Sequence, residues 1–244
     1  MRAPLTALLA NLLFAGALCL SPSCVKEAAK GPQSGGPLAA HASSDSAVPG
    51  YPATAHEQPT SFSDPPSRGP ANAPIVIETY GDFECPYCAH AAVLLRKLEQ
   101  IYPNDVRVVW RNFPLEFHAR AVPAANAALA AYEQGGNSAF WQMHDLLFAT
   151  HFAESSPGLT DEEIQAFAEK SGVAPTFVER AMNENRYTAR ISQDLERGRL
   201  MGISATPSFV LNGFVIEGLV PLKGFRHAID ALLRQRQERL KHAI

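Results

Sequence analysis

Residues 81–90 read GDFECPYCAH and contain two cysteines, Cys85 and Cys88, separated by Pro86 and Tyr87. A local cysteine pair serves as a structural disulfide, as part of a metal site, or as a redox couple. The number of other cysteines and the secondary structure expected on either side discriminate among these three uses.

The chain has four cysteines, and the other two, Cys19 and Cys24, lie near its N-terminus. A disulfide across the short Cys85–Cys88 loop would remove little entropy from the unfolded chain, so a structural staple is disfavoured. Structural zinc needs four ligands, usually from two half-sites, and the chain has no second CxxC. His90 and later histidines form no recognisable second half-site, so no metal site is expected and the redox couple is favoured.

The sequence on both sides of the pair predicts a strand followed by a helix. Ile75–Tyr80 has the alternation and β-branched residues of a strand, and the segment after the pair has apolar residues at helical spacing up to Pro103. Cys85 would then lie at a helix N-terminus, where free backbone N–H groups and the helix dipole stabilise a thiolate. Cys85 is therefore the expected attacking sulfur. Cys88, one turn later, can resolve a mixed disulfide formed at Cys85.

The rest of the domain alternates between strand and helix signals. A second strand is expected at Val106–Phe113, and the segment at about 115–202 is almost wholly helical in pattern. Asn212-Gly213 between two β-rich runs predicts a hairpin. A final helix is expected at Leu222–His242. The expected fold is therefore α/β, with a large helical insertion.

Thr206 and Pro207 precede the first strand of this hairpin. A proline is unfavourable inside a sheet, because it cannot donate a backbone hydrogen bond. A trans proline at a sheet edge and a cis peptide bond are the two interpretations, and the cis form is favoured.

In combination, the CPYC motif after a strand, the Thr-Pro before the third strand and the helical insertion resemble the thioredoxin superfamily, specifically DsbA-like thiol–disulfide oxidoreductases. The resemblance covers residues 71–244. It implies a thioredoxin-like fold in which Cys85 is the exposed nucleophile and Cys88 the buried resolving thiol. It also implies that Thr206 and a cis Pro207 lie beside the sulfurs, where the Thr206 backbone pairs with a client strand.

One departure from this family concerns the proton of the resolving thiol. Many relatives have a buried acid six residues before the first cysteine, but that position is Thr79 in this chain, and Glu78 should point to the opposite face of the strand. Glu84 is another candidate carboxylate, with a solvated turn residue as the alternative. Pro86 and Tyr87 border the sulfurs and are expected to tune the stability of the thiolate.

The N-terminal residues have the pattern of an export signal. Residues 1–23 combine one basic residue with an apolar run that is short for a membrane span, which indicates a signal peptide. LCLSPSC resembles a lipoprotein cleavage box, which would make Cys24 a lipid-attachment site. Ordinary cleavage near a small residue is the alternative, and the candidates are Ala15, Ala17 and Ser23. Residues 24–70 are rich in Pro, Gly, Ser and Ala and are expected to form a disordered linker.

The favoured function is therefore an exported thiol–disulfide oxidoreductase of the periplasm or cell envelope, most simply an oxidase. It would act on client proteins through the Cys85–Cys88 disulfide, without another cofactor, and would exchange electrons with an unidentified membrane or soluble redox partner. Disulfide isomerase or reductase is the close alternative, and a redox-silent chaperone is the alternative from another class. A monomer is expected, because the linker cannot fold into a dimerisation domain. The formal net charge of −3 gives no indication of nucleic-acid binding.

Overall fold

The computed structural model describes residues 64–153 and 158–243. The expected signal peptide, Cys24 and most of the expected linker lie outside these residues. The elements in chain order are β1 (Ser67–Arg68), β2 (Ile75–Gly81), α1 (Pro86–Ile101), β3 (Val106–Asn112), α2 (Ala121–Ala149), the short 3-10 helix η1 (Thr150–Phe152), α3 (Asp161–Lys170), α4 (Pro175–Asn183), α5 (Thr188–Leu200), β4 (Ser208–Leu211), β5 (Phe214–Glu217) and α6 (Leu222–His242). In this part of the chain, no helix combines the length and the apolar character needed to cross a membrane.

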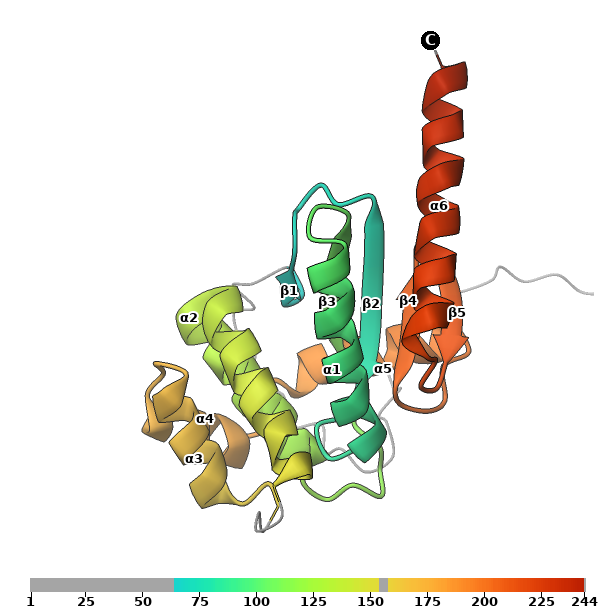
Figure 1. Ribbon diagram of the computed structural model, residues 1–244. Coiled ribbons are helices and arrows are strands. Elements are labelled where there is room, and N and C mark those ends of the chain that lie inside the picture. Colours follow the sequence, from blue (N-terminus) through green and yellow to red (C-terminus); the bar gives the residue numbers. More distant parts are fainter. Residues whose placement is uncertain (1–63, 154–157, 244) are drawn as a thin grey trace, which may run out of the picture. The chain divides into compact units, whose positions relative to one another are not determined.

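The strands form one sheet in the order β1-β3-β2-β4-β5 (Figure 1). β2 and β3 are parallel, with α1 as the connection between them, and the other neighbouring pairs are antiparallel. The β-α-β unit and the C-terminal hairpin predicted from the sequence are therefore both confirmed. In the hairpin turn, Asn212 and Gly213 both have positive φ, 46° and 93°, as a two-residue turn of type I′ requires.

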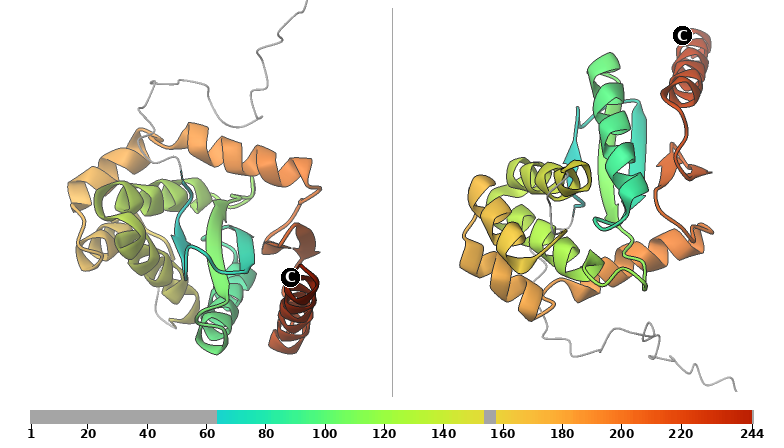
Figure 2. Two further views of the ribbon diagram at one scale, coloured as in Figure 1. Left: turned by 90° about the horizontal axis from the view of Figure 1, so that it is seen from above. Right: turned by 60° about the horizontal axis from the view of Figure 1, so that its bottom comes forward.

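The two faces of the sheet are covered by different helices (Figure 2, left). On one face, Ile77 and Thr79 are buried, and the Phe209 ring of β4 packs at 5.0 Å from the Phe225 ring of α6. α1 lies on this side as well. The opposite face of β2 carries Glu78, which contacts Arg197 of α5. The strand alternation predicted from the sequence is therefore confirmed, since Glu78 and Thr79 point to opposite sides.

The helical insertion extends from α2 to α5, in agreement with the expected segment at about 115–202. α2 is continuous except at Gly136, whose φ of 62° and ψ of −154° are not helical. The side chain of Thr160 caps α3 by accepting the Glu163 N–H at 3.2 Å.

The described domain includes residues that precede the expected linker boundary at residue 70. Ser67 and Arg68 form β1 and pair with Val109 and Val108 of β3. The Trp110 N–H donates to the Pro66 carbonyl at 2.9 Å, so the chain is already held at the sheet edge before β1. The boundary was wrong because backbone pairing needs no apolar pattern, and a two-residue strand has none.

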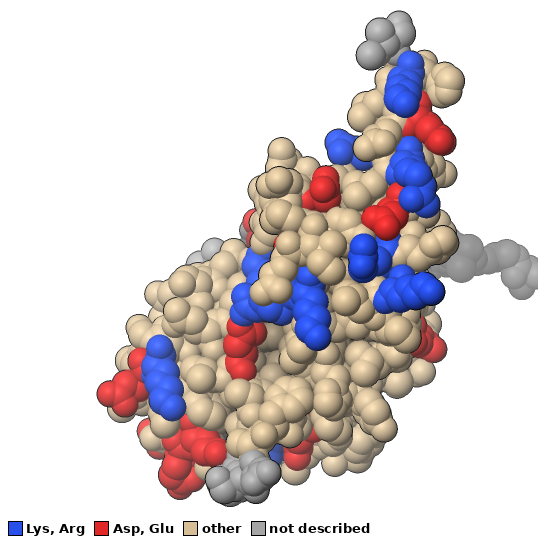
Figure 3. Space-filling view, viewed as in Figure 1, with Lys and Arg blue, Asp and Glu red and all other residues tan. Residues whose placement is uncertain are grey.

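α6 begins near the hairpin and extends beyond the sheet (Figure 1). The Tyr102 hydroxyl, just after α1, donates to Asp230 at 2.7 Å, and every described residue from 234 to 243 is exposed. Lys and Arg side chains gather along this end of the helix (Figure 3). The basic residues at this end of α6 therefore lie on a solvated helix surface.

Candidate active site

Cys85 occupies the N-cap position of α1, and Pro86 is the first residue inside the helix. The Cys85 carbonyl accepts the first helical hydrogen bonds, from Cys88 at 3.0 Å and from Ala89 at 3.3 Å. Proline fits this position because the first helical N–H has no intrahelical partner in any sequence. The motif therefore folds as the sequence predicts, with both sulfurs at the start of α1.

The pKa of the Cys85 thiol is lowered to about 5. The largest cause is the Cys88 side chain, which donates to the Cys85 sulfur, while burial acts in the opposite direction. The Thr206 side chain and the backbone N–H groups of Cys88 and Tyr87 also lower it. Because these donors favour the charged sulfur, Cys85 is a thiolate at neutral pH.

Cys88 has the opposite electrostatic character. Burial raises the pKa of its thiol well above the ordinary value, and the neighbouring Cys85 sulfur raises it further. The thiol therefore stays protonated at neutral pH. One sulfur is ready to attack, and the other must first lose a proton.

Both cysteines are free thiols and both residues are buried, with Cys85 only 4% exposed. The expectation of an exposed Cys85 is therefore wrong for this structure. The Cys85 sulfur lies 3.6 Å from the Thr206 carbonyl oxygen, to which the protonated thiol donates. Thr206 lies 121 residues away in sequence, so local sequence could not show this contact.

The peptide bond between Thr206 and Pro207 is cis. The Pro207 carbonyl accepts the Gly218 N–H at 2.9 Å, which ties this turn to the end of β5. The Thr206 hydroxyl is buried and has no hydrogen bond of ordinary geometry among the described residues. It nevertheless lies close enough to both sulfurs to lower the pKa of each.

Glu84 directs its carboxylate away from the cysteines. It accepts the Arg120 N–H at 2.6 Å, at the start of α2, and thereby holds the beginning of the helical insertion. Tyr87, between the two cysteines, is 63% exposed. Tyr87 is therefore open to solvent, whereas Glu84 makes a contact within the domain.

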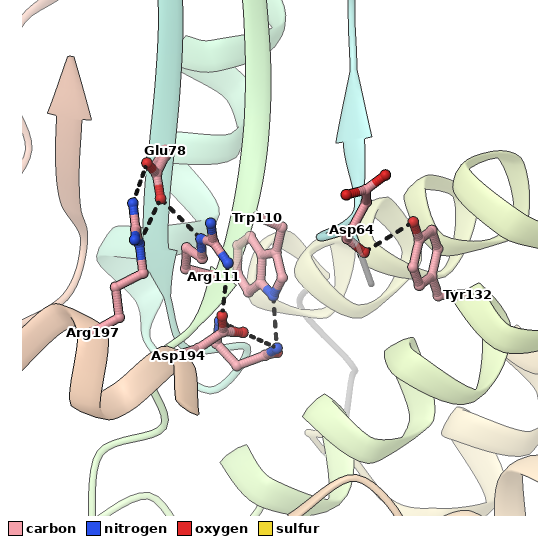
Figure 4. Close-up of polar contacts among 8 residues, drawn as sticks. Asp64, Glu78, Trp110, Arg111, Tyr132, Asp194 and Arg197 are labelled. Carbon is pink, nitrogen blue, oxygen red and sulfur yellow. Dashed lines mark hydrogen bonds and ion pairs between the residues drawn. The ribbon is translucent and has the colours of Figure 1, made fainter. Parts of the chain in front are cut away.

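Glu78 belongs to a polar network on the far face of the sheet, which is the face opposite α1 and α6 (Figure 4). It accepts from Arg111 at 2.9 Å and from Arg197 at 2.9 Å. Asp194 of α5 joins the network through Arg111 at 3.2 Å and through the backbone and side chain of Asn112. These contacts connect α5 to β2 and β3, and they hold Glu78 away from the cysteines.

Asp82, three residues before Cys85, was not singled out from the sequence. Its side chain is fully buried and accepts hydrogen bonds from the Glu84 N–H and the Leu115 N–H, each at 2.8 Å. The His118 ring contacts the same carboxyl group at 2.7 Å. An acidic residue inside the quoted stretch was the available signal, but its histidine partner lies 36 residues further along the chain.

Three exposed aromatic side chains belong to segments that contact the active-site loop. Tyr87 lies within the motif, and the ring of Phe117, 77% exposed, packs at 4.5 Å from the His118 ring. The ring of Phe152, 50% exposed, packs at 5.3 Å from His90 of α1. Each of the three therefore exposes apolar surface on a segment that contacts the active-site motif.

The Cys85 thiolate gives a direct spectroscopic prediction. Titration of the reduced protein, followed by thiolate absorbance at 240 nm, should show a midpoint at about 5 rather than at the ordinary value of about 8.5. At pH values above the ordinary thiol pKa, the lowered pKa of Cys85 stabilises the reduced folded state. This stabilisation is lost as the pH falls through about 5. Cys88→Ala should raise the midpoint, since it removes the largest cause of the shift. A midpoint near 8.5 in the unmodified protein would contradict the geometry.

Known proteins resemble this chain in sequence and in structure. The family model described as Thioredoxin matches residues 62–231. The Na⁺/H⁺ antiporter NhaA 1 of Salinispora arenicola is 36% identical over 178 residues, and the match covers 70% of this chain but only 26% of that curated relative. Pseudomonas aeruginosa DsbA2 is 28% identical with a TM-score of 0.58, covering 70% of this chain and 95% of that one. A thioredoxin-like oxidoreductase from Silicibacter pomeroyi is 28% identical with a TM-score of 0.60, covering 72% and 94%.

Proposed function

Because the chain belongs to the thioredoxin superfamily as a DsbA-like thiol–disulfide oxidoreductase, we propose that it is exported and oxidises thiols of client proteins. The observation that carries the proposal is the position of Cys85, a thiolate with a pKa of about 5 at the N-terminus of α1 and beside Thr206. The segment shared with the Na⁺/H⁺ antiporter covers 26% of that protein. Thiol exchange, and not ion transport, is the activity proposed for this segment.

In the proposed cycle, a client thiolate attacks the Cys85 sulfur of the oxidised Cys85–Cys88 pair. The bond between the two cysteines breaks, a mixed disulfide forms at Cys85, and Cys88 leaves as a thiolate that takes up a proton. A second client thiolate then attacks the client sulfur of the mixed disulfide, and Cys85 leaves as a thiolate. The client gains a disulfide, and the two cysteines of this chain gain its two electrons.

Client binding is proposed at the Thr206 turn and at the aromatic surface formed by Tyr87, Phe117 and Phe152. When the Cys85 thiol is protonated, the Thr206 carbonyl accepts a hydrogen bond from it. A thiolate or a disulfide sulfur cannot donate this bond, so the carbonyl is then free to accept a client backbone N–H. The exposed aromatic rings would contact apolar side chains that flank the client cysteine.

The low pKa of Cys85 supports the oxidase direction. A stabilised thiolate stabilises the reduced form, which makes the disulfide form a stronger oxidant. Equilibration with glutathione buffers is expected to give a reduction potential closer to about −120 mV than to about −270 mV. A potential near −270 mV would assign a reductant instead. A stable dimer in sedimentation at micromolar concentration would favour the isomerase alternative over the proposed monomer.

Export rests on the signal-peptide pattern of residues 1–23, and Cys24 is the proposed lipid-attachment site. The linker would then hold the redox domain at a membrane surface. Mass spectrometry of the mature N-terminus separates the alternatives. A diacylated Cys24 supports the lipid anchor, and an unmodified N-terminus at another position removes it.

A further inference from the structure

Only the first half of α6 packs against the sheet. Phe225 and Ile229 are 1% and 0% exposed and belong to the hydrophobic core, whereas every described residue from 234 to 243 is exposed. Residues 234–243 form the free end of α6, which extends beyond the sheet (Figure 1). About two and a half turns of helix therefore present their side chains to the surroundings of the domain.

The apolar stripe that packs α6 against the sheet continues into this free end. Four residues follow one another at intervals of four, three and four positions: Ile229, Leu233, Arg236 and Leu240. This spacing places them on one face of the helix. Leu233 is partly buried, and Leu240 is 55% exposed. The face that the core covers at Ile229 is therefore open at Leu240.

The free end of α6 is strongly basic. Four basic side chains and one acidic side chain give it a net charge of +3, whereas the whole chain has a net charge of −3. These residues are Arg234, Arg236, Arg239, Lys241 and Glu238. No ion pair joins any of the four basic side chains to another residue within 64–153 or 158–243. The positive charge is therefore available to an anionic partner.

The free end lies far from the redox cysteines. α6 follows the segment in which the Gly218 N–H donates to the Pro207 carbonyl at 2.9 Å, so the helix begins near the cis peptide. By Asp230, α6 has reached the other end of α1, where the Tyr102 hydroxyl donates to this residue at 2.7 Å. Cys85 caps the first end of α1, whose 16 residues span about 24 Å. A partner bound at the free end therefore leaves the cysteines accessible.

An anionic lipid surface matches both the charge and the apolar stripe. A second copy of α6 would bring two surfaces of charge +3 together, and like charges repel. A nucleic acid would neutralise the charge but would leave the exposed Leu240 without an apolar partner. At the surface of a bilayer, leucine side chains enter the region of the acyl chains, while arginine side chains remain among the headgroup phosphates.

We propose that the free end of α6 is a docking surface for a membrane that contains anionic lipids. Leu240 enters the acyl region, and Arg236 and Arg239 contact the headgroups. The redox cysteines then face away from the bilayer, toward clients in solution. This inference rests on the proposed export, and it adds a second membrane contact to the proposed lipid at Cys24. A single acyl chain binds a membrane reversibly, and a basic surface beside it makes the attachment stable.

Sedimentation with lipid vesicles tests this docking surface. The chain is produced from residue 24 and carries Cys24→Ser, so that neither a signal peptide nor an attached lipid contributes to binding. It should bind vesicles made of phosphatidylglycerol and phosphatidylcholine, and it should not bind vesicles of phosphatidylcholine alone. Raising the NaCl concentration from about 0.05 M to about 0.5 M should release the protein, because salt screens the attraction.

Substitutions in the free end should change vesicle binding in both directions. Arg236→Gln together with Arg239→Gln should weaken it about 25-fold, which corresponds to about 5-fold for each charge removed. Glu238→Gln should strengthen it about 5-fold for the same reason. Leu240→Gln should weaken binding at constant net charge, a loss that attraction between charges alone would not produce.

The matched control removes the same charge from other parts of the surface. Lys97 of α1 and Lys170 of α3 are exposed, so Lys97→Gln together with Lys170→Gln lowers the net charge equally and should leave vesicle binding close to that of the unsubstituted chain. All the substituted side chains are exposed, and the 240 nm titration of Cys85 should be unchanged in every variant. That titration shows whether each variant has kept its fold around the cysteines.

Several results would overturn the inference. They are equal binding to the two kinds of vesicle, no loss in the double arginine variant, and the same loss in the double lysine control. Tighter binding to a DNA duplex than to anionic vesicles would also overturn it, because the surface would then fit a nucleic acid. Exchange with a soluble peptide should be unchanged in all α6 variants. An unsubstituted chain without exchange would contradict the proposed function and leave the vesicle result standing.

Discussion

Replacing Cys85 by serine is expected to reduce thiol–disulfide exchange to the uncatalysed rate. The hydroxyl of serine is not ionised at neutral pH and forms no disulfide, whereas the Cys85 thiol has a pKa of about 5. The measurement is the oxidation of a reduced peptide with two cysteines, followed by mass spectrometry under a defined glutathione buffer. Retained exchange in Cys85→Ser would refute the assignment of Cys85 as the attacking sulfur.

Cys88→Ser should behave differently, because it leaves the attacking sulfur in place. Cys85 can still form a mixed disulfide, but no second sulfur can resolve it, so a covalent client adduct should accumulate. Cys24→Ser is the control for the cysteine outside the described domain and should leave exchange unchanged. A chaperone without redox activity would bind unfolded clients equally well in all three variants, so the comparison also tests that alternative.

The sequence predicted the position of the cysteine pair in the fold well, because that signal was local. The cysteine spacing, the proline at the first position of α1 and the strand before it together placed both sulfurs at a strand-to-helix junction. Asn212 and Gly213 predicted the hairpin because a turn of this type needs positive φ at two successive residues. The bounds of α6, Leu222–His242, agree with the expected helix.

The contacts that sequence could not predict are those made between distant segments. The sequence does not distinguish Asp82 from an ordinary turn residue. Only the fold brings Leu115 and His118 to its carboxyl group. The contact between Cys85 and Thr206 likewise joins distant segments. These interactions carry no periodic pattern, so a single sequence shows the residues without showing that they meet.

The polar network on the far face of the sheet gives the largest expected effect on stability. Asp194 is 2% exposed, and burial raises the pKa of its carboxyl group, although Asn112 and Arg111 favour the charged form. Asp194→Ala would leave the Asn112 N–H groups and the Arg111 guanidinium without this acceptor. Breaking a buried ion pair by removing one partner costs about 3–5 kcal/mol. Urea denaturation is expected to show a loss of this size in the free energy of unfolding of the variant. The slope of that free energy against urea concentration should be the same in wild type and variant.

Arg197→Ala is the matched control within the same network. The Arg197 side chain is 49% exposed, and Glu78 keeps its hydrogen bond to Arg111 when Arg197 is removed. Exposed ion pairs contribute about 0–1 kcal/mol, so this variant should be close to wild type. Asp194→Asn should lie between the two variants, because the amide oxygen can still accept the Asn112 N–H while the charge opposite Arg111 is lost.

The order of these three variants tests what holds α5 against the sheet. If burial of the carboxylate decides the cost, Asp194→Ala is the least stable variant and Arg197→Ala the most stable. If charge attraction alone decided it, removing either Asp194 or Arg197 would cost a similar amount. Because α5 leads directly into the segment that carries Thr206, a loosened α5 should also weaken the contact that lowers the Cys85 pKa. The 240 nm titration of Asp194→Ala should therefore shift to higher pH, and an unchanged midpoint would show that the Thr206 turn is held independently of α5.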